Sequence, residues 1–231
     1  MEIHGLQKLT LLDYPGKMAC TVFLAGCNLR CPFCHNSELL DRKAAPAVMD
    51  DEELLRFLKK RCGMLDGVCI TGGEPLLQPE LPDLLRKIKA LGYQVKLDTN
   101  GTMYERLRQI VAEGLVDYVA MDIKNSPSRY AESCGLETMD LESVYNSIEL
   151  LRSGNVDYEF RTTVVEQLHD SRSFQEIGEM ISGAKRYFLQ LFTDRDTVIY
   201  AGFNAPSAEK MREYVEISRK FIDFVEIRGM E

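Results

Sequence analysis

Short apolar runs alternate with longer amphipathic stretches along most of the chain. Apolar runs of strand length lie at 18–25, 67–71, 93–97, 116–121, 157–165 and 186–192. Apolar residues recur with helical spacing at 50–61, 80–91, 103–113, 140–152, 172–182 and 207–220. A regular alternation of strands and helices predicts a parallel sheet whose connecting helices lie on its outside.

The ends of the predicted helices carry local sequence signals. Asp50 and Glu53 form a capping-box-like start to the first helix, with Asp in place of Ser or Thr. Gly92 and Gly114 follow the second and third helices, where a left-handed C-cap favours glycine. These signals agree with the boundaries that the periodicity predicts.

The chain has 231 residues, which suits a single domain over 1–231, and its composition shows no seam between two domains. Residues 1–17 are predicted to form a hairpin-like lead-in segment, and residues 221–231 a C-terminal strand or a partner-facing edge. Six β-α units are too few for a closed barrel of eight strands. Parallel sheets built from β-α units carry their sites at the C-terminal ends of the strands. We therefore expect the polar clusters that follow the predicted strands to meet there.

The charge is uneven along the chain, with a net value of −8. Residues 1–63 contain nine Lys or Arg against eight Asp or Glu, whereas residues 64–231 contain 19 against 28. Overall acidity argues against nonspecific binding of nucleic acid. The apolar fraction of 45% is enough for one sizeable core.

Seven cysteines are present, an odd and irregularly spaced set apart from one triplet. This usage argues against a disulfide framework and for a reducing compartment, so we expect a cytoplasmic protein. The apolar stretch 18–27 is too short to span a bilayer, so no membrane association is expected. The four cysteines outside the triplet are expected to be small buried side chains; they are Cys20, Cys62, Cys69 and Cys134.

The triplet is Cys27, Cys31 and Cys34, with the spacing C-x3-C-x2-C. Three thiolates on one short loop suit three irons of a cubane [4Fe–4S] cluster, which usually has four thiolate ligands. The missing fourth ligand would leave one iron open for chemistry. Two other interpretations stay open. One is a zinc site, although His35 adjoins Cys34 too closely to be a convenient fourth ligand, and the other is three unrelated buried cysteines.

With Phe33 before its last cysteine, this pattern resembles the hallmark of the radical S-adenosylmethionine (radical SAM) superfamily, and the resemblance extends from Gly5 to about Phe192. It is closest to the activating enzymes of glycyl-radical enzymes, especially the activating protein of anaerobic ribonucleoside-triphosphate reductase. The resemblance implies an α/β fold, an open partial (βα)6 TIM-like barrel of the radical SAM type. It also implies that the open iron chelates the methionine part of SAM and that Phe33 lies by the adenine.

A glycine pair follows the second predicted strand in Gly72-Gly73-Glu74-Pro75. Two glycines at a strand end let a ligand approach bare backbone, although an ordinary turn would also contain such a sequence. The segment is similar to the GGE motif of the radical SAM family. That similarity implies that this backbone and Glu74 hold the methionine ammonium of SAM.

Two further polar clusters follow the next two strands. Asp98 and Thr99 precede an Asn-Gly turn, and Asp122 and Lys124 lie two apart, on one face of a strand. A structural ion network is one interpretation of these groups. Their resemblance to the pyruvate formate-lyase activating enzyme implies SAM contacts from Asp98, Asp122 and Lys124, and a monovalent cation bound by Asp98, Thr99 and Asp122.

Arg161 lies in the fifth predicted strand and matches an arginine that reaches SAM in that family; the alternative is a surface charge. Where pyruvate formate-lyase activators carry a histidine after the sixth strand, this chain has Gln190-Leu191-Phe192-Thr193, so that contact is not expected. His169 is expected to be a solvated loop histidine. His4 carries no signal.

The resemblance implies a reaction in which a reduced cluster passes one electron to SAM, and the resulting 5′-deoxyadenosyl radical takes a hydrogen atom from a glycine of a partner protein. The expected partner is a glycyl-radical enzyme, with anaerobic ribonucleotide reductase as the lead. A low-potential donor such as flavodoxin or ferredoxin would supply the electron. A basic cluster would meet this donor or would simply be solvated; it comprises Lys17, Arg30, Arg42, Lys43 and residues 59–61.

Several alternatives remain at the level of function. One is activation of pyruvate formate-lyase or another glycyl-radical enzyme, and another is a radical SAM reaction on a small molecule, nucleoside or RNA. A third is a non-catalytic electron-transfer or zinc-binding scaffold. No further cysteine cluster lies between Cys34 and Gly72 or after Cys134, which favours activases without additional clusters.

Overall fold

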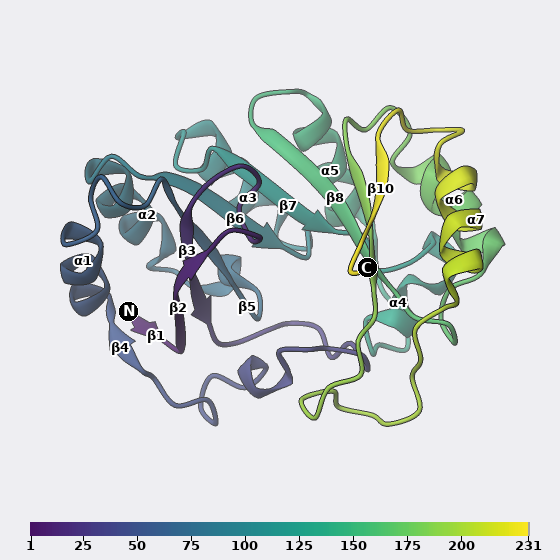
Figure 1. Cartoon of the computed structure of the whole chain (residues 1–231), viewed down its shortest axis with the longest axis horizontal. Helices are drawn as coiled ribbons and strands as arrows, with labels where there is room; N and C mark the ends of the chain where they lie inside the picture. The colour runs from purple at the N-terminus through teal and green to yellow at the C-terminus, as the bar shows by residue number, and fades with distance from the viewer. Residues whose placement is uncertain (231) are drawn as a thin grey trace.

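A computed structural model describes residues 1–230 and contains one eight-stranded sheet with the order β10-β9-β8-β7-β6-β5-β3-β2 (Figure 1). Every pair of neighbours in this sheet is parallel except β2 and β3. Its strands are β2 (Gly5–Thr10), β3 (Ala19–Leu24), β5 (Gly67–Gly72), β6 (Gln94–Thr99), β7 (Tyr118–Asp122), β8 (Asp157–Val164), β9 (Tyr187–Leu191) and β10 (Val225–Arg228). Because β2 and β10 are its two edges, the sheet is open.

The helices lie between successive strands and cover the outside of the sheet (Figure 1). They are α1 (Asp51–Lys59), α2 (Leu81–Ala90), α3 (Tyr104–Ala112), α4 (Tyr130–Ser133), α5 (Glu142–Arg152), α6 (Ser171–Met180) and α7 (Ala208–Ser218). Short 3-10 turns occur at Ser37–Leu39, Pro75–Leu77 and Pro127–Arg129. The six predicted strands and six predicted helices are all present, with boundaries shifted by a few residues.

The predicted helix ends are also confirmed. Asp50 accepts a hydrogen bond from the Glu53 backbone, and Glu53 accepts one in return from the Asp50 backbone. Gly92 and Gly114 both have positive φ angles after their helices, a conformation that costs glycine little because it lacks a Cβ.

The predicted C-terminal strand is present, because β10 extends the parallel sheet past β9; residue 231 lies outside the described residues. Two features go beyond the predicted pattern. A small antiparallel pair joins β1 (Glu2–Ile3) to β4 (Met49–Asp50). The short α4 follows β7.

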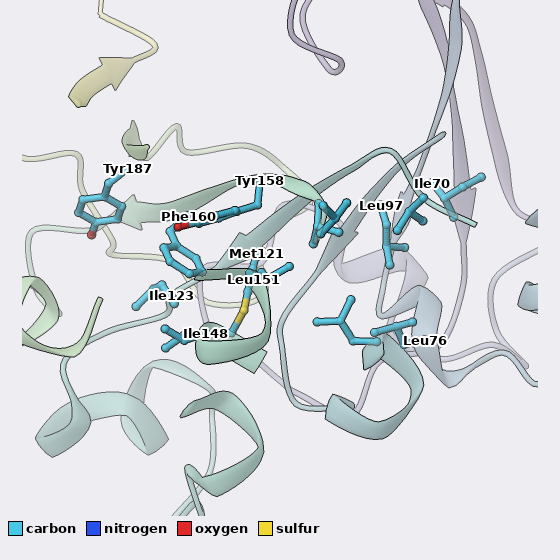
Figure 2. Packing of buried hydrophobic residues seen from close by; sticks show 14 of the residues in the cluster. Ile70, Leu76, Leu97, Met121, Ile123, Ile148, Leu151, Tyr158, Phe160 and Tyr187 are labelled. Carbon is cyan, nitrogen blue, oxygen red and sulfur yellow. The ribbon is translucent and has the colours of Figure 1, made fainter. Parts of the chain in front are cut away.

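The two faces of the sheet differ in chemistry because side chains alternate along each strand. On the outer face, Met121 of β7 lies close to Ile148 and Leu151 of α5 (Figure 2). On the inner face, Lys96, Asp98 and other charged residues are buried and paired. The outer layer therefore supplies the hydrophobic core, and the inner face supplies the polar groups described below.

Two long loops meet below the C-terminal ends of the strands, as Figure 1 shows. The loop after β3 contains His35, whose backbone oxygen accepts a hydrogen bond from Thr197 in the loop after β9. The His35 ring nitrogen Nε2 lies 2.8 Å from the Thr193 oxygen. Among the described residues, no helix is long and apolar enough to cross a membrane.

Candidate functional site

A cavity of about 940 Å³, counting space open to solvent, lies between the loop after β3 and the C-terminal ends of the strands. It is lined by nearly all of the residues predicted from the sequence, namely Cys27, Cys31, Phe33, Cys34, Gly72, Gly73, Asp98, Thr99, Asp122, Lys124 and Arg161. Segments far apart in the sequence therefore converge where the parallel sheet was expected to place them. Glu74 is the predicted site residue that is not part of this lining.

The three cysteines lie on a loop held by backbone hydrogen bonds. Gly26 N donates to Leu39 O at 2.7 Å, and Arg30 N donates to Cys134 O at 2.9 Å. The Arg30 guanidinium also donates to the Cys27 carbonyl at 2.7 Å. This exposed side chain therefore supports the cysteine loop.

Burial and neighbours set the thiol pKa values in this loop. Burial raises the pKa of Cys27 to about 11 and also raises that of Cys34. A hydrogen bond from the thiol of Cys134 lowers the pKa of Cys31 to about 7, with the Lys124 ammonium adding to the effect. Binding of iron requires thiolates, so cluster assembly would release protons here.

The glycine pair allows the end of β5 to lie against the cysteine loop. Gly73 N donates to Leu24 O, and Glu74 N donates to Gly26 O, both at 2.8 Å. A Cβ at Gly72 would overlap Leu24 O, and one at Gly73 would overlap Gly26 O. Gly72 also has a φ of +123°, which disfavours any other residue. The pair is needed for close backbone contact and leaves bare main chain on the cavity wall.

Glu74 lies beneath the cavity rather than in it, which differs from the contact that the resemblance implied for its side chain. Its carboxylate accepts hydrogen bonds from Leu76 N, Thr99 Oγ1 and Asn100 N at 3.1, 2.9 and 2.7 Å. Burial raises its pKa to about 7, and these three bonds oppose the rise. The side chain joins the end of β6 to the segment after β5.

Arg161 bridges the two predicted carboxylates. Its Nε and Nη2 lie 3.0 and 2.9 Å from Asp122 Oδ1, and its Nη1 lies 3.3 Å from Asp98 Oδ2. Lys124 donates to Asp122 Oδ2 at 3.0 Å. Burial would raise the pKa of Asp122, but Arg161 and Lys124 outweigh it and hold the pKa at about 2. The surface-charge interpretation of Arg161 is wrong, because its side chain lies in this network.

Lys96 is a residue of the network that sequence reasoning missed. It is 1% exposed, and its Nζ is hydrogen-bonded to Asp98 Oδ1. The signal was available, because a lysine inside an apolar run, two residues before Asp98, must share its face of the strand.

Two other expectations are corrected by the structure. His169 is buried rather than solvated: its Nε2 lies 3.0 Å from Lys124 O, and burial lowers its pKa to about 4. Cys62 is exposed, whereas the other three cysteines outside the triplet are buried as predicted. Gln190 belongs to the segment that lacks the histidine of pyruvate formate-lyase activators, and it lines the cavity.

The side chains present fit an iron–sulfur cluster with a bound sulfonium ligand. Three thiols from one loop face the same cavity, while the Cys134 thiol is not part of the lining. Bare backbone at Gly72 and Gly73 suits an ammonium group. The cationic Arg161 and Lys124 suit a carboxylate.

Comparisons with known proteins agree with this site. A family model described as the radical SAM superfamily matches residues 21–181. A relative from Methanocaldococcus jannaschii, named as a glycyl-radical enzyme activating enzyme, is 32% identical over 98% of this chain and 95% of its own length. A pyruvate formate-lyase-activating enzyme of Clostridium pasteurianum is 38% identical, over 54% of this chain and 52% of that enzyme.

Among solved structures, Streptococcus suis SuiB bound to S-adenosylmethionine matches 91% of this chain and 52% of its own, with a TM-score of 0.70 and 12% identity. A likeness at this identity concerns the fold. It confirms the expected α/β architecture, an open and mostly parallel barrel.

Proposed function

Because the chain belongs to the radical SAM superfamily, and is therefore an enzyme that uses a [4Fe–4S] cluster and SAM, we propose that it activates a glycyl-radical enzyme. The observation that supports this most is the M. jannaschii match, which spans nearly the whole of both chains. The C. pasteurianum relative is named for the same type of reaction, although it matches over a shorter stretch.

Different residues of the cavity would bind the cluster and SAM. Cys27, Cys31 and Cys34 would hold three irons of the cluster and leave the fourth for the amino and carboxylate groups of SAM. When bound, the reduced cluster would supply the single electron that cleaves SAM, and the cleaved nucleoside would then take hydrogen from a glycine Cα. The protein orients these groups and excludes water. Phe33, which is buried and lines the cavity, would contact the adenine.

We propose anaerobic ribonucleotide reductase as the partner that carries this glycine, and a low-potential protein such as flavodoxin or ferredoxin as the electron donor. The segment 190–193, which lacks the histidine of pyruvate formate-lyase activators, favours this partner. Pyruvate formate-lyase is the second candidate, on the strength of the 38% identity to its activating enzyme.

The test is anaerobic reconstitution with iron and sulfide, followed by reduction and incubation with SAM and each candidate partner. We expect a glycyl-radical doublet in the electron paramagnetic resonance (EPR) spectrum of anaerobic ribonucleotide reductase, with 5′-deoxyadenosine formed alongside. Cys31→Ser should abolish both signals, because it removes an iron ligand. Cys62→Ser is the matched control and should behave as the wild type, because Cys62 is exposed and outside the cavity.

The outcomes separate the partner from the reaction. A doublet on pyruvate formate-lyase alone would overturn the partner and keep the activase function. Formation of 5′-deoxyadenosine with a small molecule or nucleoside, and no doublet on either protein, would overturn the activase function itself.

A further inference from the structure

The oxygens of Asp98, Asp122 and Thr99 are of the type that hard cations prefer. The sequence resemblance implied a monovalent cation at these residues. In the structure, each carboxylate oxygen of the aspartate pair already accepts a hydrogen bond from a cationic side chain. Asp98 is bonded through Oδ1 to Lys96 and through Oδ2 to Arg161, and burial of its carboxylate is outweighed by these two cations, which lower its pKa.

The side-chain oxygens of Asp122 and Thr99 also take part in hydrogen bonds within the protein. Asp122 accepts from Arg161 at Oδ1 and from Lys124 at Oδ2. The Thr99 hydroxyl donates to Glu74 at 2.9 Å and accepts from Gly101 N at 3.1 Å. A metal cation would therefore have to share oxygens that already bind cationic side chains or, at Thr99, a backbone amide.

The net charge of these buried side chains also disfavours a metal cation. Three cationic side chains, Lys96, Arg161 and Lys124, surround two carboxylates, so the set already carries an excess of one positive charge. Glu159, the next buried carboxylate on this face, is bonded at both oxygens by Arg228, so counting this pair as well leaves the excess unchanged. Another cation would be repelled strongly at a buried site of low effective dielectric constant.

Lys96 is the unusual member of the set. A fully buried ammonium is costly unless it is paired, and its hydrogen-bonding neighbours are Asp98 and the Cys69 sulfur, 3.8 Å away. Lys96 lies two residues before Asp98 on β6, so both side chains are on the same face of the strand and lie side by side. A compact point charge of this kind resembles a potassium or ammonium ion more than a guanidinium does.

We propose, on the basis of the function proposed above, that the Lys96 ammonium takes the place of a monovalent metal cation beside the SAM site. Arg161 and Lys124 complete a charge set that needs no metal ion. Lys96 is thus a positioning residue, which acts on SAM through Asp98 and Arg161.

The test compares the wild type with Lys96→Met, whose unbranched side chain keeps most of the volume and removes the charge. Thermal unfolding of the cluster-free protein is measured in tetramethylammonium, sodium and potassium chloride at equal ionic strength. The wild type should show the same midpoint in all three. Lys96→Met should have a lower midpoint in tetramethylammonium and regain about 3 °C or more in potassium, which would bind the vacated position.

Anomalous diffraction from crystals soaked in thallium(I), a heavy substitute for potassium, locates the ion directly. We expect no thallium beside either aspartate in the wild type, and a peak beside Asp98 Oδ1, where the Lys96 ammonium lies in the wild type, in Lys96→Met. The matched control is Lys89→Met, which breaks the 2.6 Å pair with Asp117 outside the cavity and should gain nothing from potassium.

Three results would overturn the proposal. They are a thallium peak at the wild-type aspartates, a wild-type midpoint that potassium raises, and a folded Lys96→Met that gains nothing from potassium. The wild-type measurements decide the question even if the variant fails to fold. Because none of these readouts involves SAM turnover, failure of the activase function would leave them unaffected.

Discussion

Glu74 illustrates how one buried side chain supports a site without lining it. Its carboxylate receives donors from the segment after β5 and from the end of β6, so the two strand ends are held at a fixed separation. The glycines before it lie on the cavity wall. We infer that the acidic residue of this motif acts here by fixing the backbone that meets the ligand.

The raised pKa of Glu74 predicts a pH dependence of stability. Because its folded pKa of about 7 exceeds the ordinary value of 4.5, the folded state binds the proton more tightly than the unfolded state does. Stability should therefore fall as pH rises from about 4.5 to about 7, and then level off, by up to about 3 kcal/mol in total.

Urea unfolding of the wild type and Glu74→Gln across pH 4.5–8 measures this effect. The variant lacks the titrating group, so the difference in free energy of unfolding between the two proteins should change across this range. A difference that stays constant would show that Glu74 does not titrate there.

The lining of the cavity was largely predictable from the sequence, because each residue belongs to a motif directly after a strand. The direction of Glu74 was not predictable, since it depends on donors from β6. His169 was misjudged for a similar reason: its partner is a backbone oxygen of Lys124, 45 residues away in the chain. Such roles are set by tertiary contacts that local patterns do not encode.

At the scale of elements, β10 is attached to the sheet by an internal ion pair as well as by its backbone. Arg228 donates to both oxygens of the fully buried Glu159 on β8, at 2.7 and 2.8 Å. Its guanidinium also lies 3.4 Å from the ring centroid of Phe188 on β9. Although burial would raise the pKa of Glu159, Arg228 holds it below the ordinary value.

Arg228→Met should therefore lower the free energy of unfolding by about 3–5 kcal/mol, because it leaves a buried carboxylate without its main partner. Arg108→Met is the matched control; it removes an exposed pair with Glu105 and should cost less than about 1 kcal/mol. Adding Glu159→Gln to Arg228→Met should recover part of the loss. Equal effects of the two single substitutions in urea unfolding would contradict this account.

The long elements were predictable because their periodicity extends over several turns or over a whole strand. The pair β1 and β4 was not, since each has only two residues and depends on its partner. The short α4 was likewise too brief for a periodic signal. It matters nevertheless, because Cys134 at its end bonds to the cysteine loop.

At the scale of the whole molecule, one sheet carries both an apolar outer layer and a charged inner face. We propose that the chain forms a single domain, because its strands form one continuous sheet apart from the small β1–β4 pair. The loop after β3 lines the cavity, and a hydrogen bond from Thr197 to His35 O joins it to the loop after β9. In the proposed function a partner glycine would reach the cavity beside these loops, so we expect partner specificity to depend on them.

In the proposed enzyme, three thiolates leave one iron of the cluster for SAM. The most direct measurement is the EPR spectrum of the reduced, reconstituted protein with and without SAM, alongside an iron count. We predict about four irons per chain and a spectrum that changes when SAM is added. A cluster that ignores SAM in the wild type but responds in Cys134→Ser would contradict the claim, since it would place a fourth protein ligand on the open iron.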